Sequence, residues 1–273
     1  MRVDYKGSTI LITGASSGIG REMARQLAGQ AGTLVLTARR TERLEELKAE
    51  LTGQHSSLNV AVIPCDLADN SARNAYIARV QEEVGAVDVL INNAGFGDTA
   101  FFETTDWSKL QKMVQLNIEA LTHLMHAFLG GMVERKKGGI LNVSSGFGMV
   151  SIPLFGVYCG TKHYVTALTE AVRAEVKPAG VVISQLCPGP VATEFVAVAG
   201  NPMGQDPPKA FEISAEDCSR IALKGFSRGK ATIIPGFLMK VMMAMHGLTP
   251  RWFFRFLISL AGGSIRRQLK LNP

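Results

Sequence analysis

The chain has 273 residues, of which 47% are hydrophobic and 19% are charged. These proportions are ordinary for a globular protein, exclude a low-complexity or disordered chain, and allow one large α/β domain. The formal net charge is +6, and residues 237–273 hold six basic residues and no acidic one, so the preceding residues balance at 23 basic and 23 acidic. Because the basic excess is confined to one end, we expect no nucleic-acid binding by the body of the protein.

The four cysteines are scattered, with no CxxC spacing and no histidine cluster. We therefore expect neither a disulfide framework nor a metal site, and a reducing compartment. The N-terminus has no basic start followed by an apolar run, so we expect no signal peptide and a cytoplasmic location.

Short apolar runs alternate with helical patterns along the first 236 residues. The runs predicted to be strands are 8–13, 33–37, 59–64, 87–95, 139–145, 181–187 and 231–235. The patterns predicted to be helices are 18–28, 41–51, 70–84, 106–130, 156–177 and 215–227. Strands that are apolar on both faces and are each followed by a helix form parallel sheets with right-handed crossovers.

This alternation predicts an α/β fold with a doubly wound, Rossmann-type parallel sheet of about seven strands and helices on both faces. No linker or repeat divides the pattern, so we predict a single domain over residues 1–236. Residues 237–273 are expected to form a basic, amphipathic C-terminal helical extension.

The segment T-G-A-S-S-G-I-G, residues 13–20, joins the first predicted strand to the first predicted helix. Glycine permits positive φ and close backbone approach, and a helix N-terminus attracts a pyrophosphate. The first two glycines are separated by three residues, unlike the G-x-G-x-x-G pattern, and an ordinary tight turn is the alternative. The residues predicted to bind a dinucleotide here are Gly14, Ser16, Ser17, Gly18, Ile19 and Gly20.

The end of the second predicted strand reads A-R-R, with Ala38 where NAD enzymes of this architecture place an acid. Guanidinium groups pair with a 2′-phosphate, so Arg39 and Arg40 predict NADP(H) as the cofactor, the alternative being arginines that cap a strand end. After the third strand, Asp66 and Leu67 are expected near the adenine, although an aspartate before a helix is also a common N-cap.

Tyr158 and Lys162 are four residues apart in the stretch Y-C-G-T-K. On a helix such residues lie on one face, one turn apart. A nearby ammonium favours the phenolate, so the pair predicts a phenol that acts as a proton donor.

Together, the glycine pattern, N-N-A-G (92–95), the serine pair 144–145, Y-x-x-x-K (158–162) and P-G (188–189) resemble the short-chain dehydrogenase/reductase family. The resemblance extends from residue 7 to residue 235 and implies an oxidoreductase that transfers hydride to or from a nicotinamide cofactor. Members of this family are often homo-oligomers, so the resemblance also implies one here.

The resemblance implies four catalytic roles. Tyr158 would protonate the carbonyl oxygen, and Lys162 would hold the nicotinamide ribose and lower the pKa of Tyr158. Ser145, thirteen residues before the tyrosine, would orient the substrate oxygen, and Asn117 would support a water relay to the lysine.

The resemblance also implies further contacts with the cofactor. Asn93, Ala94 and Gly95 would contact the adenosine ribose. The nicotinamide would be bound by residues of the P-G-P-V-A-T segment, namely Pro188, Gly189, Val191 and Thr193.

The leading hypothesis is an NADP(H)-dependent carbonyl reductase or alcohol dehydrogenase. An epimerase or dehydratase on the same scaffold is one alternative, although such relatives usually have another glycine spacing and a longer substrate domain. A non-catalytic NADP sensor or scaffold is the other, and it would normally have lost Tyr158 or Lys162.

Four apolar side chains are predicted to form a substrate pocket: Phe96, Phe147, Met149 and Phe195. They favour a hydrophobic ketone or alcohol, such as an acyl chain, a sterol-like ring or a retinoid, although some of them could belong to the core. Residues 190–213 are rich in glycine and proline and are expected to form a lid over the substrate.

In the extension, one predicted helix begins at residue 251 and has a mostly apolar face. It could cover the substrate entrance or a partner subunit, or lie on an anionic membrane surface. Burial against protein is favoured over membrane contact. The apolar face comprises Trp252, Phe253, Phe256, Leu257 and Leu260, and the polar stripe comprises Arg251, Arg255 and Ser259.

Overall fold

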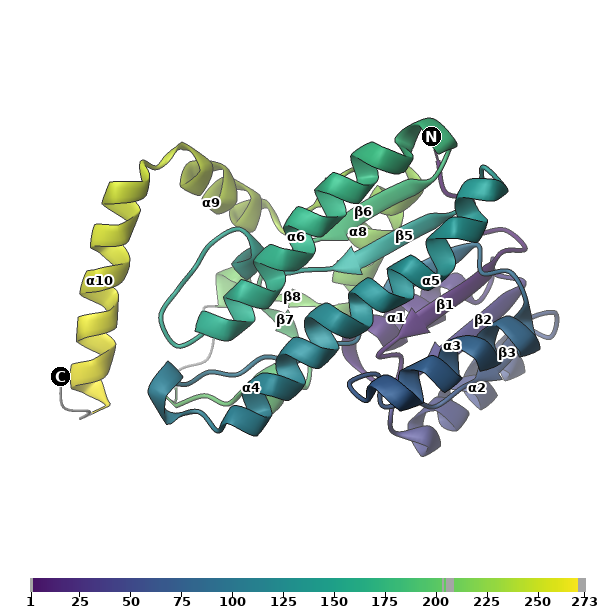
Figure 1. Cartoon of the computed structure of the whole chain (residues 1–273), viewed down its shortest axis with the longest axis horizontal. Helices are drawn as coiled ribbons and strands as arrows, with labels where there is room; N and C mark the ends of the chain where they lie inside the picture. Colours follow the sequence, from purple (N-terminus) through teal and green to yellow (C-terminus); the bar gives the residue numbers. More distant parts are fainter. Residues whose placement is uncertain (1, 203, 205–208, 270–273) are drawn as a thin grey trace.

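The computed structural model describes residues 2–202, 204 and 209–269. Its centre is a seven-stranded parallel sheet in the order β3-β2-β1-β4-β5-β6-β9 (Figure 1). The strands are β1 (Thr9–Thr13), β2 (Thr33–Thr37), β3 (Asn59–Val62), β4 (Val89–Asn92), β5 (Gly139–Val143), β6 (Val182–Leu186) and β9 (Thr232–Ile233). The predicted Rossmann-type sheet is therefore confirmed.

Helices cover both faces of this sheet. In Figure 1, α3, α5 and α6 lie in front of the sheet, and α1, α2 and α8 lie behind it. The helices are α1 (Gly18–Leu27), α2 (Thr41–Gln54), α3 (Asn70–Val84), α4 (Trp107–Val114), α5 (Leu121–Glu134), α6 (Gly156–Val176), α7 (Phe195–Ala199), α8 (Ala215–Ser227), α9 (Phe237–Leu248) and α10 (Arg251–Gln268).

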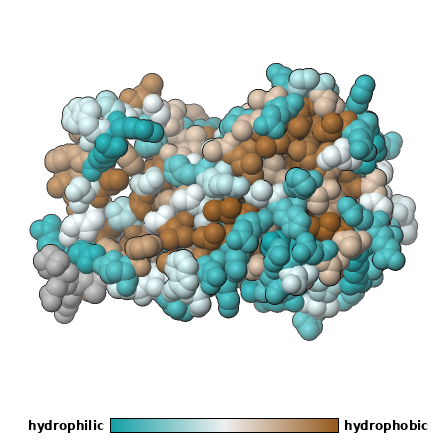
Figure 2. All heavy atoms as spheres, in the orientation of Figure 1, coloured by the Kyte–Doolittle hydropathy of each residue, from teal (hydrophilic) through white to brown (hydrophobic). Residues whose placement is uncertain are grey.

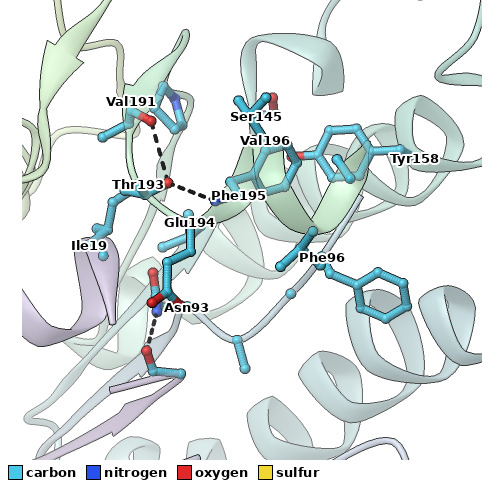
Figure 3. Close-up of a pocket in the computed structure, with 18 of the residues that line it drawn as sticks. Ile19, Asn93, Phe96, Ser145, Tyr158, Val191, Thr193, Glu194, Phe195 and Val196 are labelled. Atoms are coloured by element: carbon cyan, nitrogen blue, oxygen red, sulfur yellow. Dashed lines mark hydrogen bonds between the residues drawn. The ribbon is translucent and has the colours of Figure 1, made fainter. Parts of the chain in front are cut away.

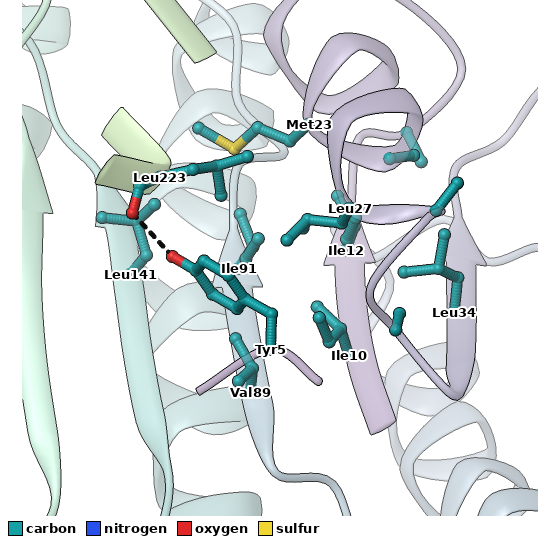
Figure 4. Packing of buried hydrophobic residues seen from close by; sticks show 14 of the residues in the cluster. Tyr5, Ile10, Ile12, Met23, Leu27, Leu34, Val89, Ile91, Leu141 and Leu223 are labelled. Carbon is teal, nitrogen blue, oxygen red and sulfur yellow. Dashed lines mark hydrogen bonds between the residues drawn. The ribbon is translucent and has the colours of Figure 1, made fainter. Parts of the chain in front are cut away.

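The alternation of side chains along each strand divides the core in two. Ile10 and Ile12 of β1 pack with residues of α1, α2 and α8, whereas Leu11 packs with residues of α3, α5 and α6. Figure 4 shows the first of these clusters, in which the Tyr5 hydroxyl donates to the carbonyl oxygen of Leu223 at 2.8 Å. Apolar burial on both faces is the main force that stabilises such a sheet.

The order of the strands reverses between β1 and β4, which are neighbours although they are not consecutive. Loops that leave the carboxyl ends of strands on the two sides of such a point diverge, and the crevice between them is where ligands bind in this class of fold. The glycine loop follows β1, and the N-N-A-G segment begins in β4, so both lie at this crevice.

The predicted long helix over 106–130 instead consists of α4, a π-helical turn at Gln115–Ala120 and α5, which extends to Glu134. A π-turn shifts the side chains that follow it relative to those before it, and such turns are common at functional sites. Asn117 lies within this turn.

The segment predicted as a lid has secondary structure of its own. Within the described part of residues 190–213, β7 (Val191–Ala192) pairs in parallel with β8 (Ile213–Ser214), and α7 lies between them along the chain.

The extension forms α9 and α10, separated by Thr249 and Pro250. Helix α9 buries Met239 and Met243 against the body, whereas α10 has no buried residue among those described and projects beside the body (Figure 1). In Figure 2, apolar residues are visible on the surface of this part of the molecule. Among the described residues of one chain, the apolar face of α10 is therefore not buried against protein, and its burial against a partner subunit stays a prediction.

Among the described residues, Arg266 joins α10 to the body. Arg266 forms an ion pair with Glu103, and its guanidinium lies 4.5 Å from the ring centroid of Phe101. Within the described part of the chain, no helix has both the length and the apolar content needed to cross a membrane.

Candidate active site

A cavity of about 800 Å³ lies at the carboxyl ends of the strands, between the glycine loop and α9. Figure 3 shows some of its lining residues, among them Ile19, Ser145 and Tyr158. The cavity is lined by all but three of the predicted site residues. These are Gly14, Ser16, Ser17, Gly18, Ile19, Arg39, Arg40, Asp66, Leu67, Asn93, Ala94, Gly95, Phe96, Ser145, Phe147, Tyr158, Lys162, Pro188, Gly189, Val191, Thr193 and Phe195.

The glycine loop is held in place by close backbone packing. Gly14 has a φ of +67°, and a Cβ there would lie 2.8 Å from Nδ2 of Asn93. Asn93 in turn donates from Nδ2 to the carbonyl oxygen of Thr13 at 2.9 Å. Asn93 therefore holds the loop that it faces, besides lining the cavity.

The start of α1 fits a diphosphate. Ser17 is the N-cap but its side chain makes no capping hydrogen bond, and the first turn contains no acidic residue. The backbone N–H groups and the positive end of the helix dipole are thus free of a side-chain anion and face the cavity. The donor set is the one that a dinucleotide requires.

Gly20 is not among the residues that line the cavity, and its role as a cofactor contact stays a prediction. A Cβ at this position would lie 2.5 Å from both Nδ2 of Asn93 and the carbonyl oxygen of Gly14. The glycine is required because the helix packs directly against the loop.

Arg40 connects the glycine loop with the other side of the cavity. Its guanidinium donates to Oγ of Ser16 at 3.2 Å and Oγ of Ser17 at 2.9 Å, and it pairs with Glu194 at 2.9 Å. Arg39 is exposed and lines the same end of the cavity. Two cationic side chains at this end suit an anionic group on the cofactor.

After β3, Asp66 does not cap α3, because Asp69 does so by accepting a hydrogen bond from the Ala72 amide at 2.7 Å. The Asp66 carboxylate accepts from the Ala68 amide at 3.2 Å and lines the cavity beside Leu67. The N-cap alternative for Asp66 is therefore excluded.

Tyr158 and Lys162 lie one turn apart on α6, and both side chains are buried where they line the cavity. The Lys162 Nζ lies 5.8 Å from the centroid of the Tyr158 ring and donates to the carbonyl oxygen of Val143 at 2.8 Å. Ser145 lines the cavity opposite this helix face and accepts a hydrogen bond from the Phe147 amide at 3.1 Å.

Burial raises the pKa of the Tyr158 hydroxyl well above its ordinary value, and a hydrogen bond with Ser145 opposes this effect. Burial also lowers the pKa of Lys162 to about 8. The prediction that Lys162 lowers the pKa of Tyr158 does not hold in the protein alone, because desolvation of the phenol dominates and Ser145 provides the opposing contact.

Asn117 is buried and lies behind the cavity instead of lining it. Its Oδ1 accepts from the amide of Phe96 at 3.2 Å, and its Nδ2 donates to the carbonyl oxygen of Phe96 at 2.9 Å and to Oγ1 of Thr161 at 3.1 Å. It thereby connects the segment after β4 to α6, next to Lys162.

The apolar part of the cavity surrounds Tyr158. The ring centroids of Phe195 and Phe147 lie 5.5 and 6.3 Å from that of Tyr158, and Phe96 packs in the same cluster. Met149 is not among the residues that line this cavity, so its place in the substrate pocket stays a prediction. It is half-buried and caps the short turn Gly146–Gly148.

Several lining residues were missed by the sequence analysis. Phe155 immediately precedes α6, and its ring packs at a tilt against that of Phe147, with a centroid distance of 4.9 Å. Met239 and Met242 come from α9, and Glu194 follows Thr193. Phe155 could have been found from its position within one turn of Tyr158, but no local pattern marks the two methionines, which approach the cavity through tertiary packing.

The family described as short chain dehydrogenase matches residues 8–203 of this chain. The chain is 33% identical to the human dehydrogenase/reductase SDR family member 7 over 222 residues, which cover 78% of this chain and 66% of that protein.

Solved structures agree with this assignment. A short-chain dehydrogenase from Sphingobium yanoikuyae in complex with NADPH has a TM-score of 0.78 and 29% identity, covering 88% of this chain and 94% of the other. A bulky-bulky ketone specific alcohol dehydrogenase from Comamonas testosteroni has a TM-score of 0.75 and 27% identity, covering 88% and 93%. Another similar structure holds NAD. The fold, the residues of the cavity and the match over most of the chain together place this protein in the short-chain dehydrogenase/reductase family of oxidoreductases.

Proposed function

We propose that this protein is an NADP(H)-dependent oxidoreductase that interconverts a hydrophobic ketone and its secondary alcohol. The observation that carries the proposal is the position of Tyr158, whose ring lies between apolar side chains and whose hydroxyl contacts Ser145 inside the cavity. A bound nicotinamide supplies the hydride, and the protein supplies binding, orientation and a proton.

Each proposed catalytic residue has one task. Tyr158 donates the proton to the carbonyl oxygen in reduction, and Ser145 orients that oxygen by a second hydrogen bond. Lys162 binds the ribose hydroxyls beside the nicotinamide. Asn117 holds the backbone of Phe96 and the Thr161 hydroxyl, and it supports the path by which solvent protons reach Lys162.

The proposed cofactor contacts follow the length of the cavity. The loop residues from Gly14 to Ile19 bind the diphosphate, and Arg39 and Arg40 bind a 2′-phosphate at the exposed end. The adenosine contacts Asp66, Leu67, Asn93, Ala94 and Gly95, and the nicotinamide contacts Pro188, Gly189, Val191 and Thr193. NADP(H) is proposed over NAD because two arginines, and no acid, follow β2.

The proposed substrate class rests on the lining of the cavity near Tyr158. Phenylalanines from three segments, together with Met239 and Met242, provide an apolar surface with room for a bulky group. The likeness to an alcohol dehydrogenase specific for bulky-bulky ketones supports the same class. Turnover of small charged keto acids alone would contradict it.

The substitution Tyr158→Phe tests the enzymatic function. It removes the proton donor but keeps the ring, so we expect kcat to fall by about 10²- to 10⁴-fold for an apolar ketone. NADPH affinity, measured by fluorescence, should change little.

Tyr164→Phe is the matched control for this substitution. This residue lies on the same helix, with its hydroxyl 3.1 Å from that of Thr122 and exposed to solvent, so kcat should be preserved. Undiminished turnover in Tyr158→Phe would overturn the proposed chemistry. NADPH binding without turnover of any ketone in the unmodified protein would favour a sensor or scaffold.

We also propose that residues 237–273 are an extension of a single domain, 1–236, and that α9 and α10 attach the protein to an anionic membrane surface in the cytoplasm. The part of the chain that the structure describes has fifteen exposed large hydrophobic residues, and eleven of them lie between Phe237 and Leu260. Five basic residues and no acidic one accompany them in α9 and α10. Such a surface complements anionic lipid, whereas an isologous contact between two copies would bring like charges together.

Sedimentation with vesicles tests the membrane proposal. We expect binding to vesicles that contain phosphatidylserine, weaker binding to phosphatidylcholine alone, and loss of binding in a Trp252→Glu, Phe256→Glu variant. Trp107→Glu changes an equally exposed tryptophan outside the extension and should have no effect. Unchanged binding in the double variant would contradict the proposal.

We also propose that the protein forms a homo-oligomer through surfaces other than α9 and α10. Its mass in sedimentation should therefore be the same in the double variant as in the unmodified protein.

A further inference from the structure

Glu194 connects the two ends of the cavity. It lies between Thr193 and the first residue of α7, and its carboxylate pairs with Arg40 at 2.9 Å and with Arg43 at 2.6 Å. In Figure 3 its side chain points away from Tyr158 and Phe195. The arginines belong to the segment after β2, at the adenosine end, whereas Glu194 belongs to the segment that covers the substrate end.

The side chains around Arg40 form an anion-binding site, and the carboxylate of Glu194 already occupies it. Besides Glu194, the Arg40 guanidinium contacts Oγ of Ser16 and Oγ of Ser17, both in the glycine loop. A guanidinium fork binds a carboxylate and a phosphate with the same geometry. The guanidinium that is proposed to bind the 2′-phosphate is therefore paired with a side chain of the lid.

We propose that Glu194 is a built-in competitor of the 2′-phosphate of the cofactor. When the phosphate binds Arg40, the carboxylate is displaced, and the segment Phe195–Ala199 is released from the arginines. This inference rests on the proposed use of NADP(H), and it adds a coupling between recognition of the phosphate and the wall of the substrate cavity.

The exposure of the ion pairs makes this exchange feasible. The side chains of Arg40, Arg43 and Glu194 are 43%, 41% and 46% exposed, and ion pairs this exposed are weak and screened by salt. A phosphate monoester carries more charge than a carboxylate and offers more acceptor oxygens. The two arginines lower the pKa of Glu194 to about 2, so the competing carboxylate is ionised at neutral pH.

The released segment is small and directly contacts the reaction site. Helix α7 has five residues, and Ala199 is the buried one, held by a hydrogen bond from the Thr99 amide to its carbonyl oxygen at 2.9 Å. At the other end of α7, the Phe195 ring packs against Tyr158. Movement at Glu194 would therefore change the apolar wall beside the proton donor.

Binding of adenosine nucleotides tests the competition. Glu194→Gln removes the charge of the competitor, so we expect 2′,5′-ADP to bind about three- to tenfold more tightly than to the unmodified protein, the range expected for weak exposed pairs. Affinity for 5′-AMP, which lacks the 2′-phosphate, should change by less than about twofold. Glu212→Gln makes the same change in charge at an exposed position near the other end of the segment 190–213 and should alter neither affinity.

Hydrogen exchange of the Phe195–Ala199 amides tests the release. In the unmodified protein, 2′,5′-ADP should speed this exchange and 5′-AMP should not. In Glu194→Gln the faster exchange should be present without any nucleotide, and 2′,5′-ADP should add nothing to it.

The outcomes separate this inference from the proposed cofactor. If the unmodified protein binds 2′,5′-ADP no more tightly than 5′-AMP, the proposed preference for NADP(H) fails. If it prefers 2′,5′-ADP but Glu194→Gln binds it equally or more weakly, or exchange at 195–199 is unaltered, the role of Glu194 fails and the preference stands.

Discussion

The Nζ of Lys162 donates a hydrogen bond to the carbonyl oxygen of Val143, the last residue of β5, at 2.8 Å. This contact ties the middle of α6 to the carboxyl end of the central strand and places a cationic group in a site that is almost closed to solvent. Burial of the ammonium has a measurable consequence for stability, because it disfavours the charged form in the folded state only.

The free energy of unfolding should depend on the protonation of Lys162. Its pKa is lowered from an ordinary value of 10.5 to about 8. Between these values the unfolded chain binds a proton that the folded chain does not, so stability rises as the pH increases through the window. Relative to Lys162→Met, the unmodified protein should gain roughly 1 to 3 kcal/mol from pH 8 to pH 10.5.

Urea unfolding of both proteins at several pH values measures this difference, and the other titrating groups cancel because both proteins contain them. A constant difference between the two across the window would show that Lys162 does not titrate there.

Gly20→Ala should destabilise the protein and weaken dinucleotide binding. The added methyl group would lie 2.5 Å from Asn93 Nδ2 and Gly14 O, so the glycine loop must shift, at a cost of about 1 to 3 kcal/mol. Gly130→Ala, in α5 with nothing within 4 Å of its added Cβ, is the control and should stabilise the protein by about 0.5 to 1 kcal/mol. Thermal unfolding and NADPH titration measure both effects, and equal behaviour of the two variants would contradict this view of the loop.

Arg40→Leu should weaken NADPH binding about tenfold or more while changing NADH affinity by less than about threefold, because a charge-assisted contact to the 2′-phosphate is lost. Arg220→Leu makes the same substitution at an exposed arginine that pairs with Asp217 outside the cavity, and both affinities should be preserved. Fluorescence titration with each nucleotide gives the ratio. Equal weakening of NADPH and NADH by Arg40→Leu would count against a phosphate-binding role.

Asn142→Leu should lower the free energy of unfolding by about 2 to 4 kcal/mol, the effect of leaving buried polar groups unpaired. Asn142 is fully buried, donates to Oγ1 of Thr169 at 2.9 Å and accepts from Nδ2 of Asn92 at 3.0 Å. Asn92 is the first residue of the N-N-A-G segment. Its contact with Asn142 joins β4 to β5, and the contact of Asn142 with Thr169 joins both strands to α6. Urea unfolding measures the loss, and a change below about 0.5 kcal/mol would show that the pair adds nothing to stability.

Local sequence patterns were sufficient to predict the central sheet, and together with the family resemblance they predicted about half of the residues that line the cavity. The apolar runs predicted all seven strands, because a strand buried on both faces must be apolar along its length. The i, i+4 spacing of Tyr158 and Lys162 placed both on one face of α6. The glycine spacing predicted the loop at the start of α1, where backbone packing excludes larger side chains.

Contacts between distant segments could not be predicted in this way. Glu194 meets Arg40 and Arg43 across more than 150 residues, Met239 reaches the cavity from α9, and Asn117 lies in a π-turn where a regular helix was predicted. The sequence by itself determined which residues can form strands, turns and a Tyr–Lys face, since these depend on steric and apolar preferences a few residues long. Only the tertiary structure decided which charges meet, which side chains are desolvated and which apolar faces stay exposed, because burial and pairing depend on segments brought together by packing of the whole chain.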